Sequence, residues 1–579
     1  MLRTLRLGFS LAILASAAIF AHAAIKPNLI LITLDATRAD RMGFLGAEAG
    51  LTRNSDRLAA ESVVFEHAYA QAPATVVSHA TILSGTYPQA CGMSEIGGTL
   101  PSSLPYLPDL LKAQGYRTAA FVSSIELDPR DGAAQGFDRG FHTYQADGGT
   151  APLGRRAERS SAARRAPSSP IRRRPDQVVA SATAWLTRNA QAPFFLWMHL
   201  AAPHPTAASY NAAMTAEDAA IGKLLSILRQ QKLDATTAVV VTASHGESLG
   251  AHGEETHGIF LYDETVHVPL LVKLPGGQAT PKKVTAKVRL VDVAPTLLEI
   301  AGASVPSQMQ GQSLLRIARA ARAPDQPVYS RADLPQRGFG WSPLESWRAG
   351  KYLYIHAPKP ELYDLTADPG ATRNLAQSSK ATLDTMAAQL ENFDRRFTGE
   401  TGKSSGPELS SSEMQKLASL GYVGLQKSAG ASAAVTGTDP KDKIAVANKV
   451  IEAAETAAHG KPDQAIAALT PITAADPNLY LAQYTMGVAL SQKGQYAEAA
   501  KHLHKAVELQ PDSAWAHYAI GAALLKTGDY KTAAVHMEIA TTRLPNYDPA
   551  HKSLAEAYDH LGRAEDAKKE RNKAAGPKS

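Results

Sequence analysis

The first two thirds of the chain contains short stretches that are apolar at nearly every position, rather than at every second position. Continuous hydrophobicity predicts strands that are buried on both faces of a mostly parallel sheet. Apolar residues at helical spacing over Ala216–Gln230, between two of these stretches, indicate an α/β layered fold with flanking helices. The predicted strands are Leu29–Leu34, Thr118–Val122, Phe194–Leu200, Ala238–Thr242 and Pro269–Leu274.

Polar residues follow two of these predicted strands directly. Asp35 comes after the first strand, and Ser244, His245 and Gly246 come soon after the fourth. In open α/β sheets, ligands bind at the carboxyl ends of the strands. We therefore expect these side chains to contribute to one site.

The C-terminal part follows a different pattern, with a constant step of 34 residues. This period resembles the tetratricopeptide repeat, in which each unit is a pair of helices. We expect the small glycines and alanines to allow close helix contact and the prolines to end each second helix. The repeated positions are Gly460, Gly494, Gly528 and Gly562; Ala465, Ala499, Ala533 and Ala567; and Pro477, Pro511 and Pro545.

The pattern divides the chain into segments. Residues 26–400 form the predicted α/β domain, and residues 401–445 form a linker rich in Ser, Gly, Ala and Thr, with a short helix near Ser412–Leu420. Residues 446–575 form four repeat units of an all-α domain. Repeats of this kind present a surface to a protein or peptide partner, or pack against the neighbouring domain.

Residues 1–23 resemble an export signal. Arg3 and Arg6 precede the apolar run Leu7–Phe20, which is too short to span a bilayer, and small residues follow at 21–23. We expect a periplasmic or extracellular protein, with an uncleaved N-terminal anchor as the alternative. No later segment is long and apolar enough to span a membrane.

Composition adds little to this picture. The formal net charge of the 579-residue chain is +6, and part of the excess lies in an arginine run over residues 155–174. No aromatic residues interleave that run, so we interpret it as a solvated loop and expect no nucleic-acid partner. Cys91 is the only cysteine, which excludes an intramolecular disulfide.

Several ordered motifs across residues 26–400 make this region similar to the sulfatase family of the alkaline phosphatase superfamily. That resemblance implies an α/β fold and a hydrolase of sulfate, phosphate or phosphonate esters. The matching segments are Pro27–Asp35, Ala72–Pro88, Phe194–Leu200, Pro203–Pro205, Ser244–Gly253, Thr256–Gly258, Val291–Leu298 and Glu361–Leu365.

The resemblance also implies roles for individual residues. Asp35, Thr75 and His245 would hold a divalent metal ion, which is calcium, zinc, manganese or magnesium. Thr75, His204 and His257 would be catalytic, with Thr75 as the nucleophile or as a metal-bound hydroxyl. His79 and His204 would contact the ester substrate.

Thr75 stands where sulfatases carry a Cys or Ser that is oxidised to formylglycine. The β-methyl group of Thr75 means that the same oxidation would give a ketone instead of an aldehyde. We therefore expect a phosphate-type ester as the substrate, with sulfate ester hydrolysis as the second hypothesis.

Three positions depart from the family pattern: Val77 replaces a Pro, Ala202 replaces an Asp, and Ser244 replaces a metal-binding Asp. A hydroxyl is a poorer ligand for a hard divalent ion than a carboxylate. A mononuclear site, a displaced ligand such as Glu247 and loss of the metal all remain open. The competing hypothesis is therefore a degenerate domain that binds without turnover, in a scaffold protein that acts through its repeats.

Overall fold

The computed structural model describes residues 26–93, 98–130, 133–146, 173–191, 193–201, 207–277, 282–320, 325–398, 410–420 and 435–574. The predicted export signal, His204 and the arginine run up to residue 172 lie outside these residues.

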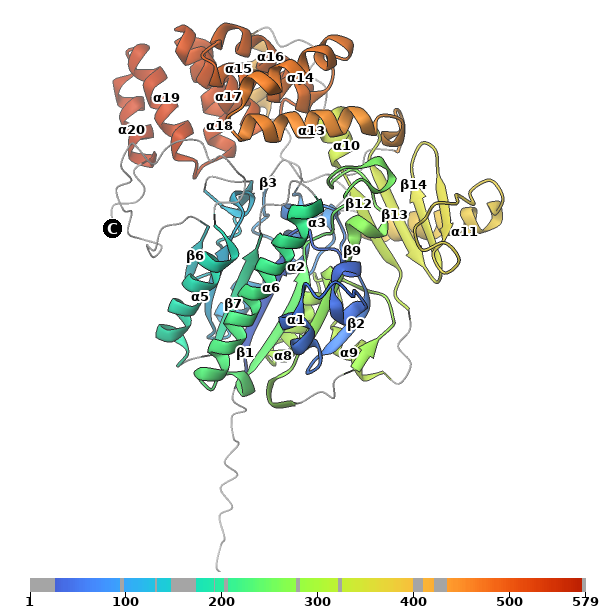
Figure 1. Cartoon of the computed structure of the whole chain (residues 1–579). Coiled ribbons are helices and arrows are strands. Elements are labelled where there is room, and N and C mark those ends of the chain that lie inside the picture. The colour runs from blue at the N-terminus through green and yellow to red at the C-terminus, as the bar shows by residue number, and fades with distance from the viewer. Residues whose placement is uncertain are drawn as a thin grey trace, which may run out of the picture.

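A mostly parallel sheet organises the first domain, as the apolar stretches predict (Figure 1). In the described residues its strand order is β10-β2-β9-β8-β1-β7-β4-β6, with β11 paired to β2. The neighbours β8, β1, β7 and β4 are parallel, whereas β9 runs antiparallel to β8 and β2. The strands are β1 (Asn28–Leu34), β2 (Val63–Tyr69), β4 (Arg117–Val122), β6 (Thr143–Gln145), β7 (Phe194–Leu200), β8 (Thr237–Ala243), β9 (His267–Lys273), β10 (Lys282–Val284) and β11 (Val288–Arg289).

Helices pack against this sheet in two groups. In one, α6 lies between α1 and α5; in the other, α2, α4 and α8 contact one another. Their bounds are α1 (Arg53–Ala59), α2 (Thr75–Ser84), α4 (Leu107–Ala113), α5 (Pro175–Asn189), α6 (Ala207–Gln230) and α8 (Val293–Ile300).

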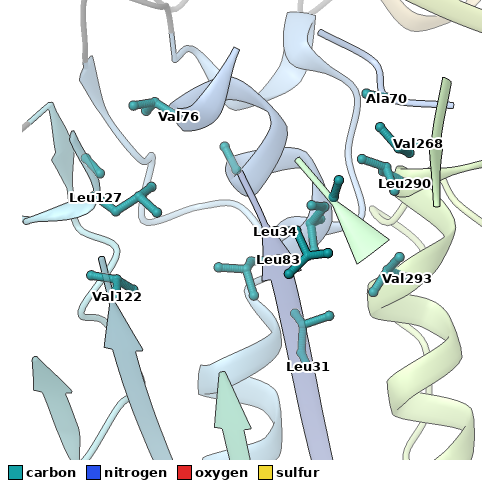
Figure 2. Close-up of a cluster of buried hydrophobic side chains, with 14 of the residues drawn as sticks. Leu31, Leu34, Ala70, Val76, Leu83, Val122, Leu127, Val268, Leu290 and Val293 are labelled. Carbon is teal, nitrogen blue, oxygen red and sulfur yellow. The ribbon is translucent and has the colours of Figure 1, made fainter. Parts of the chain in front are cut away.

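Helix α2 is the most deeply embedded of these elements, because every one of its residues is buried. Val76 and Leu83 of α2 share one hydrophobic cluster with Leu31 and Leu34 of β1 (Figure 2). The helix ends at Gly85, whose φ of 66° is a left-handed conformation that glycine adopts without strain. Burial on all sides fixes the position of the first residue of α2, Thr75, above the end of β1.

The end of the arginine run belongs to the fold, which differs from the expected solvated loop. Arg173 is buried and donates hydrogen bonds to the Gln145 carbonyl and the Ser181 hydroxyl. Arg174 is exposed and pairs with Asp176 in the first turn of α5. A guanidinium that satisfies buried carbonyls is a structural group, and this local role has no sequence signal.

A second, antiparallel sheet lies beside the first and has no counterpart among the predicted strands. It contains β12 (Val328–Ala332), β13 (Leu344–Ala349), β14 (Tyr352–His356) and β15 (Glu361–Asp364) in that order. Helix α11 (Lys380–Thr398) covers it, with Phe393 stacked 4.8 Å from Tyr329 between ring centroids. These strands are short and mix charged with aromatic residues, so their apolar pattern was too weak to predict.

The C-terminal domain consists of helix pairs, and two of the three markers have the expected roles. Ala465, Ala499, Ala533 and Ala567 are fully buried, and the repeated prolines follow the ends of α14, α16 and α18. The helices are α13 (Ile444–Ala458), α14 (Pro462–Ala475), α15 (Tyr480–Gln492), α16 (Tyr496–Leu509), α17 (Ala514–Thr527), α18 (Tyr530–Arg543), α19 (Asp548–His560) and α20 (Ala564–Ala574).

The repeated glycines have a different role from the expected helix contact. Gly460, Gly494, Gly528 and Gly562 have φ values of 74°, 78°, 85° and 72°, which place them in left-handed turns between paired helices. Close helix contact falls instead at Gly487, where an added Cβ would lie 2.4 Å from Leu503. The 34-residue period identified the repeats correctly, but the prediction that the repeated glycines allow close helix contact was wrong.

The repeats pack on the catalytic domain at a loop near the predicted site (Figure 1). Asn448 of α13 donates to the Gly253 carbonyl at 2.8 Å and accepts from the Glu255 amide at 3.2 Å. Nearby, Arg337 of α10 (Leu334–Phe339) forms a 3.2 Å ion pair with Asp512. Within the part of the chain that the structure describes, no helix combines the length and apolar character that a bilayer crossing needs.

Candidate active site

Three parallel strands end at the same level and bring the site residues together. The Asp35 amide donates to the Leu200 carbonyl at the end of β7, and the Ser244 amide donates to the Leu34 carbonyl, both at 2.9 Å. Directly after Asp35 the chain turns at Ala36, whose φ of 45° is rare for a residue other than glycine. Strained backbone beside a half-buried carboxylate is typical of a functional site.

Thr75 begins α2 and points at this carboxylate. Its Oγ1 donates to Asp35 Oδ1 at 3.2 Å, and the residue is only 6% exposed. No side chain at the preceding Ala74 caps the helix. The amide groups of the first turn therefore give a positive partial charge close to the Thr75 hydroxyl, which favours an anion at this position.

Asp35 is an ionised carboxylate in this setting. Burial raises its pKa, but the interaction with His199, whose Nε2 lies 3.7 Å from Oδ1, outweighs burial and holds the pKa well below the ordinary value. Two hydroxyl groups also stabilise the negative charge, because Thr75 and Ser244 both donate to Oδ1. The Ser244 bond to Asp35 is 3.1 Å long.

The hydrogen bonds around Ser244 fix the tautomer of His245. The Ser244 hydroxyl has one proton, which it donates to Asp35, so its 2.9 Å contact with His245 Nδ1 requires the proton to be on Nδ1. Burial lowers the pKa of His245 to about 3, so the ring is neutral at neutral pH. Its Nε2 then carries a lone pair and, among the described residues, has no hydrogen-bond partner.

His257 carries a positive charge, opposite to the negative charge of Asp35. Its Nδ1 lies 3.1 Å from Glu247 Oε2, and its ring centroid lies 4.2 Å from that of His245. Burial opposes protonation, but the charge of Glu247 and the hydrogen bond to it outweigh burial and raise the pKa of His257 to about 9. His257 is therefore a cationic proton donor at neutral pH.

His79 has a different place from the one the family resemblance implies. Its Nδ1 is 2.7 Å from the Thr75 carbonyl, its Nε2 is 2.9 Å from Thr33 Oγ1, and the side chain is fully buried. Burial lowers its pKa to about 3. With both nitrogens engaged, His79 fastens the start of α2 to β1, and this differs from the expected contact with substrate.

Sequence reasoning missed two residues beside Asp35 and Thr75. His199 Nε2 lies 3.7 Å from Asp35 Oδ1, and neither ring nitrogen has a hydrogen-bond partner in the described residues. Glu126, in the short helix η3 (Ile125–Leu127) after β4, lies close enough to Thr75 and Asp35 for both side chains to affect its pKa. Burial and the charge of Asp35 raise the pKa of Glu126. His199 was concealed inside an apolar strand, and a lone Glu after a strand has no distinguishing pattern.

The donor set does not fit the divalent metal ion that the family resemblance implies. Asp35 is the one carboxylate bonded to both Thr75 and Ser244, and a hydroxyl stands where the family has a second carboxylate. Across the described ranges, no three His, Cys, Asp or Glu side chains are grouped as metal ligands. Hard divalent ions favour several carboxylate oxygens. The ligand set Asp35, Thr75 and His245 therefore stays a prediction.

The structure thus brings Asp35, Thr75, His245 and His257 into one cluster, although their sequence positions are far apart. His204 lies outside the described residues, so its predicted contact with substrate stays untested. Glu247 is present in the cluster as the partner of His257.

Three protein-family models match parts of the chain. Residues 27–303 match the Sulfatase family model, residues 256–396 match the N-sulphoglucosamine sulphohydrolase C-terminal model, and residues 487–528 match a TPR repeat model. These matches indicate a sulfatase-like region followed by tetratricopeptide repeats.

The chain is also similar to proteins with sulfatase names, and its first domain shares its fold with solved structures. The chain is 26% identical over 428 residues to an ulvan-active sulfatase of Formosa agariphila, which covers 63% of this chain and 80% of that protein. It is 32% identical over 180 residues to mouse arylsulfatase K, but this match spans only 29% of this chain and 32% of that protein. The phosphonate monoester hydrolase of Agrobacterium radiobacter superposes with a TM-score of 0.52 at 18% identity, over 64% of this chain and 96% of that one.

Proposed function

We propose that the sulfatase-family domain hydrolyses a tetrahedral oxyanion ester, of sulfate or phosphate type, with the Thr75 hydroxyl as nucleophile. The observation that carries this proposal is the placement of Thr75 Oγ1 on a half-buried, ionised carboxylate at the positive end of α2. Relatives whose names specify sulfatase activity, together with a phosphonate monoester hydrolase of the same fold, support this substrate class.

The chain's own groups are sufficient for the first half of the reaction. The anionic ester binds between the amides at the start of α2 and the His257 cation. Thr75 Oγ1 attacks the sulfur or phosphorus atom, and its proton passes to one of the two adjoining carboxylates, Asp35 or Glu126. His257 gives its Nε2 proton to the departing alkoxide oxygen, so that the alcohol leaves neutral.

Water completes the cycle. It attacks the ester now carried by Thr75, the threonine hydroxyl is released, and sulfate or phosphate leaves. The threonine acts as an unmodified hydroxyl in this scheme, because oxidation of its β-carbon would give a ketone. No step is assigned to a metal, since the donor set around Asp35 offers a serine hydroxyl in place of a second carboxylate.

The remaining expectations become part of the proposal. The N-terminal residues 1–23 support export to the periplasm or the cell exterior. The substrate would then be an ester outside the cytoplasm, and the repeats would receive a protein or peptide partner.

Turnover of aryl sulfate and aryl phosphate by the full chain tests the proposal. Thr75→Ala should lower kcat/KM by about 10³-fold or more, because the nucleophile is lost. Thr75→Ser should keep most of the activity, and the exposed control Thr187→Ala should change nothing. The mass of the peptide that contains Thr75 should correspond to unmodified threonine.

Two results would overturn this reading. A folded chain that is inert on both esters supports the alternative of a degenerate binding domain. A Thr75→Ala variant that remains fully active removes threonine from the mechanism.

A further inference from the structure

A short helix in the linker lies on the repeat domain. Helix α12 (Ser411–Ser419) is closed by a capping box, in which Ser410 Oγ accepts from the Glu413 amide and Glu413 Oε2 accepts from the Ser410 amide. An isolated helix of this length is marginal in water. Contacts with the rest of the chain must therefore provide most of its stability.

One face of α12 makes these contacts. Glu413 and Leu417 are buried, while Lys416 and Leu420 are half-buried, at the i, i+3, i+4 and i+7 spacing of a single helical face. Met414, on another face, is 49% exposed. The sequence pattern of the buried face is Glu-x-x-Lys-Leu-x-x-Leu.

The receiving surface has the complementary charges. Arg543 at the end of α18 donates to Glu413 from Nε and Nη2, at 3.1 and 3.2 Å, and both side chains are largely buried. Lys416 pairs with Glu538, which lies one turn earlier on the same helix and also accepts from the Tyr558 hydroxyl of α19. We call Asp512, Glu538, Arg543 and Tyr558 the α12 docking surface.

Each end of this surface is anchored in the fold. Arg543 also donates to the Asp512 carbonyl, and Asp512 forms the ion pair with Arg337 of the catalytic domain. Glu538 receives a second cation, since Arg563 lies 3.6 Å away. The acidic and basic groups are therefore held in place before a helix binds, which is the arrangement of a preformed binding site.

We propose that the α12 docking surface is the peptide-binding site of the repeat domain, and that α12 is its built-in competitor. Residues 401–409 and 421–434 join α12 to the two domains, so α12 is a covalently tethered occupant of this surface. The external partner is a short amphipathic helix with the same Glu-x-x-Lys-Leu pattern. Such a partner must compete against a tethered helix whose effective concentration is in the millimolar range.

The proposal is tested with a fluorescent synthetic peptide of residues 409–421 and the full chain. The double variant Glu413→Arg with Leu417→Asp removes α12 from its own site and should bind the peptide about 100-fold more tightly than the unchanged chain. Met414→Asp alters the exposed face of α12, so that chain should behave like the unchanged one.

A charge exchange makes the test specific. Adding Arg543→Glu to the double variant should abolish binding of the natural peptide, and a peptide carrying Glu413→Arg should restore it. Circular dichroism of each chain establishes that the repeats remain folded.

Two outcomes overturn the proposal. One is equal peptide binding by the unchanged chain and the folded double variant, or no binding by either. The other is a dimer of the unchanged chain that dissociates in the Leu417→Asp variant, which would assign the surface to exchange of α12 between copies.

Discussion

Buried histidines in the repeats and in the catalytic domain differ in their hydrogen bonds. In the repeats, His517 contacts His536 Nδ1 at 2.9 Å and the Pro511 carbonyl at 2.9 Å, so both ring nitrogens are engaged. His551, 34 residues later, contacts Glu570 at 2.6 Å and the Pro545 carbonyl at 3.0 Å. These two repeats thus use the same position to hold the first helix to the preceding proline and to the second helix.

At the strand ends of the catalytic domain, buried histidines lack most of these hydrogen bonds. His199 and His245 are as deeply buried as His517, yet three of their four ring nitrogens have no hydrogen-bond partner among the described residues. Buried polar atoms without partners reduce stability, and folded proteins contain few of them. We infer that the paired histidines stabilise the repeats, whereas the unpaired ones are retained for contact with a ligand.

Replacing His517 should have the largest effect on stability. His517→Leu removes two hydrogen bonds and takes a partner from the Pro511 carbonyl, which should lower the free energy of unfolding of the repeats by about 2–4 kcal/mol. Urea unfolding followed by circular dichroism measures this change. Turnover by the catalytic domain should persist.

The matched control for this prediction is His504→Leu, on the outer part of α16, where the side chain is 43% exposed. Its cost should be below about 0.5 kcal/mol. Equal losses for the two histidines would show that hydrogen bonding is not the source of the difference.

Replacing Ser244 by the carboxylate that the family pattern has at this position tests the comparison in the catalytic domain. Ser244→Asp places a second negative charge beside the half-buried Asp35 carboxylate, and should lower the free energy of unfolding by about 1–3 kcal/mol without metal. Manganese or calcium at about 100 times its Kd should then return about 2.7 kcal/mol. Thermal unfolding with and without metal, for the variant and the parent, measures both effects.

The parent chain should show no metal-dependent rise in Tm, and the exposed control Ser226→Asp should match the parent. A rise in the parent as large as that in the variant would establish Asp35, Thr75 and His245 as a sufficient ligand set. That outcome would contradict the donor-set argument.

The sequence predicted the parts of this molecule that depend on long, uniform patterns. The central strands, the repeats and the position of Asp35 after a strand all follow from apolar continuity or a fixed period. The association of Thr75 with Asp35 and of His257 with His245 needed the fold, because parallel strand ends bring distant segments together.

What the sequence could not provide is the environment of single side chains. His79 has the same residue type in either role, and only its two short hydrogen bonds show that it holds α2. Glu126 became a site residue because the chain after β4 turns towards α2, which depends on the fold and has no marker in the sequence.

The most direct test of the central claim is the effect of the same substitution at His199. Because neither nitrogen of His199 has a hydrogen-bond partner, His199→Leu should change the free energy of unfolding by less than about 1 kcal/mol while it abolishes turnover of the aryl ester. A loss of stability as large as that of His517→Leu, with turnover retained, would contradict the account and make His199 a structural residue.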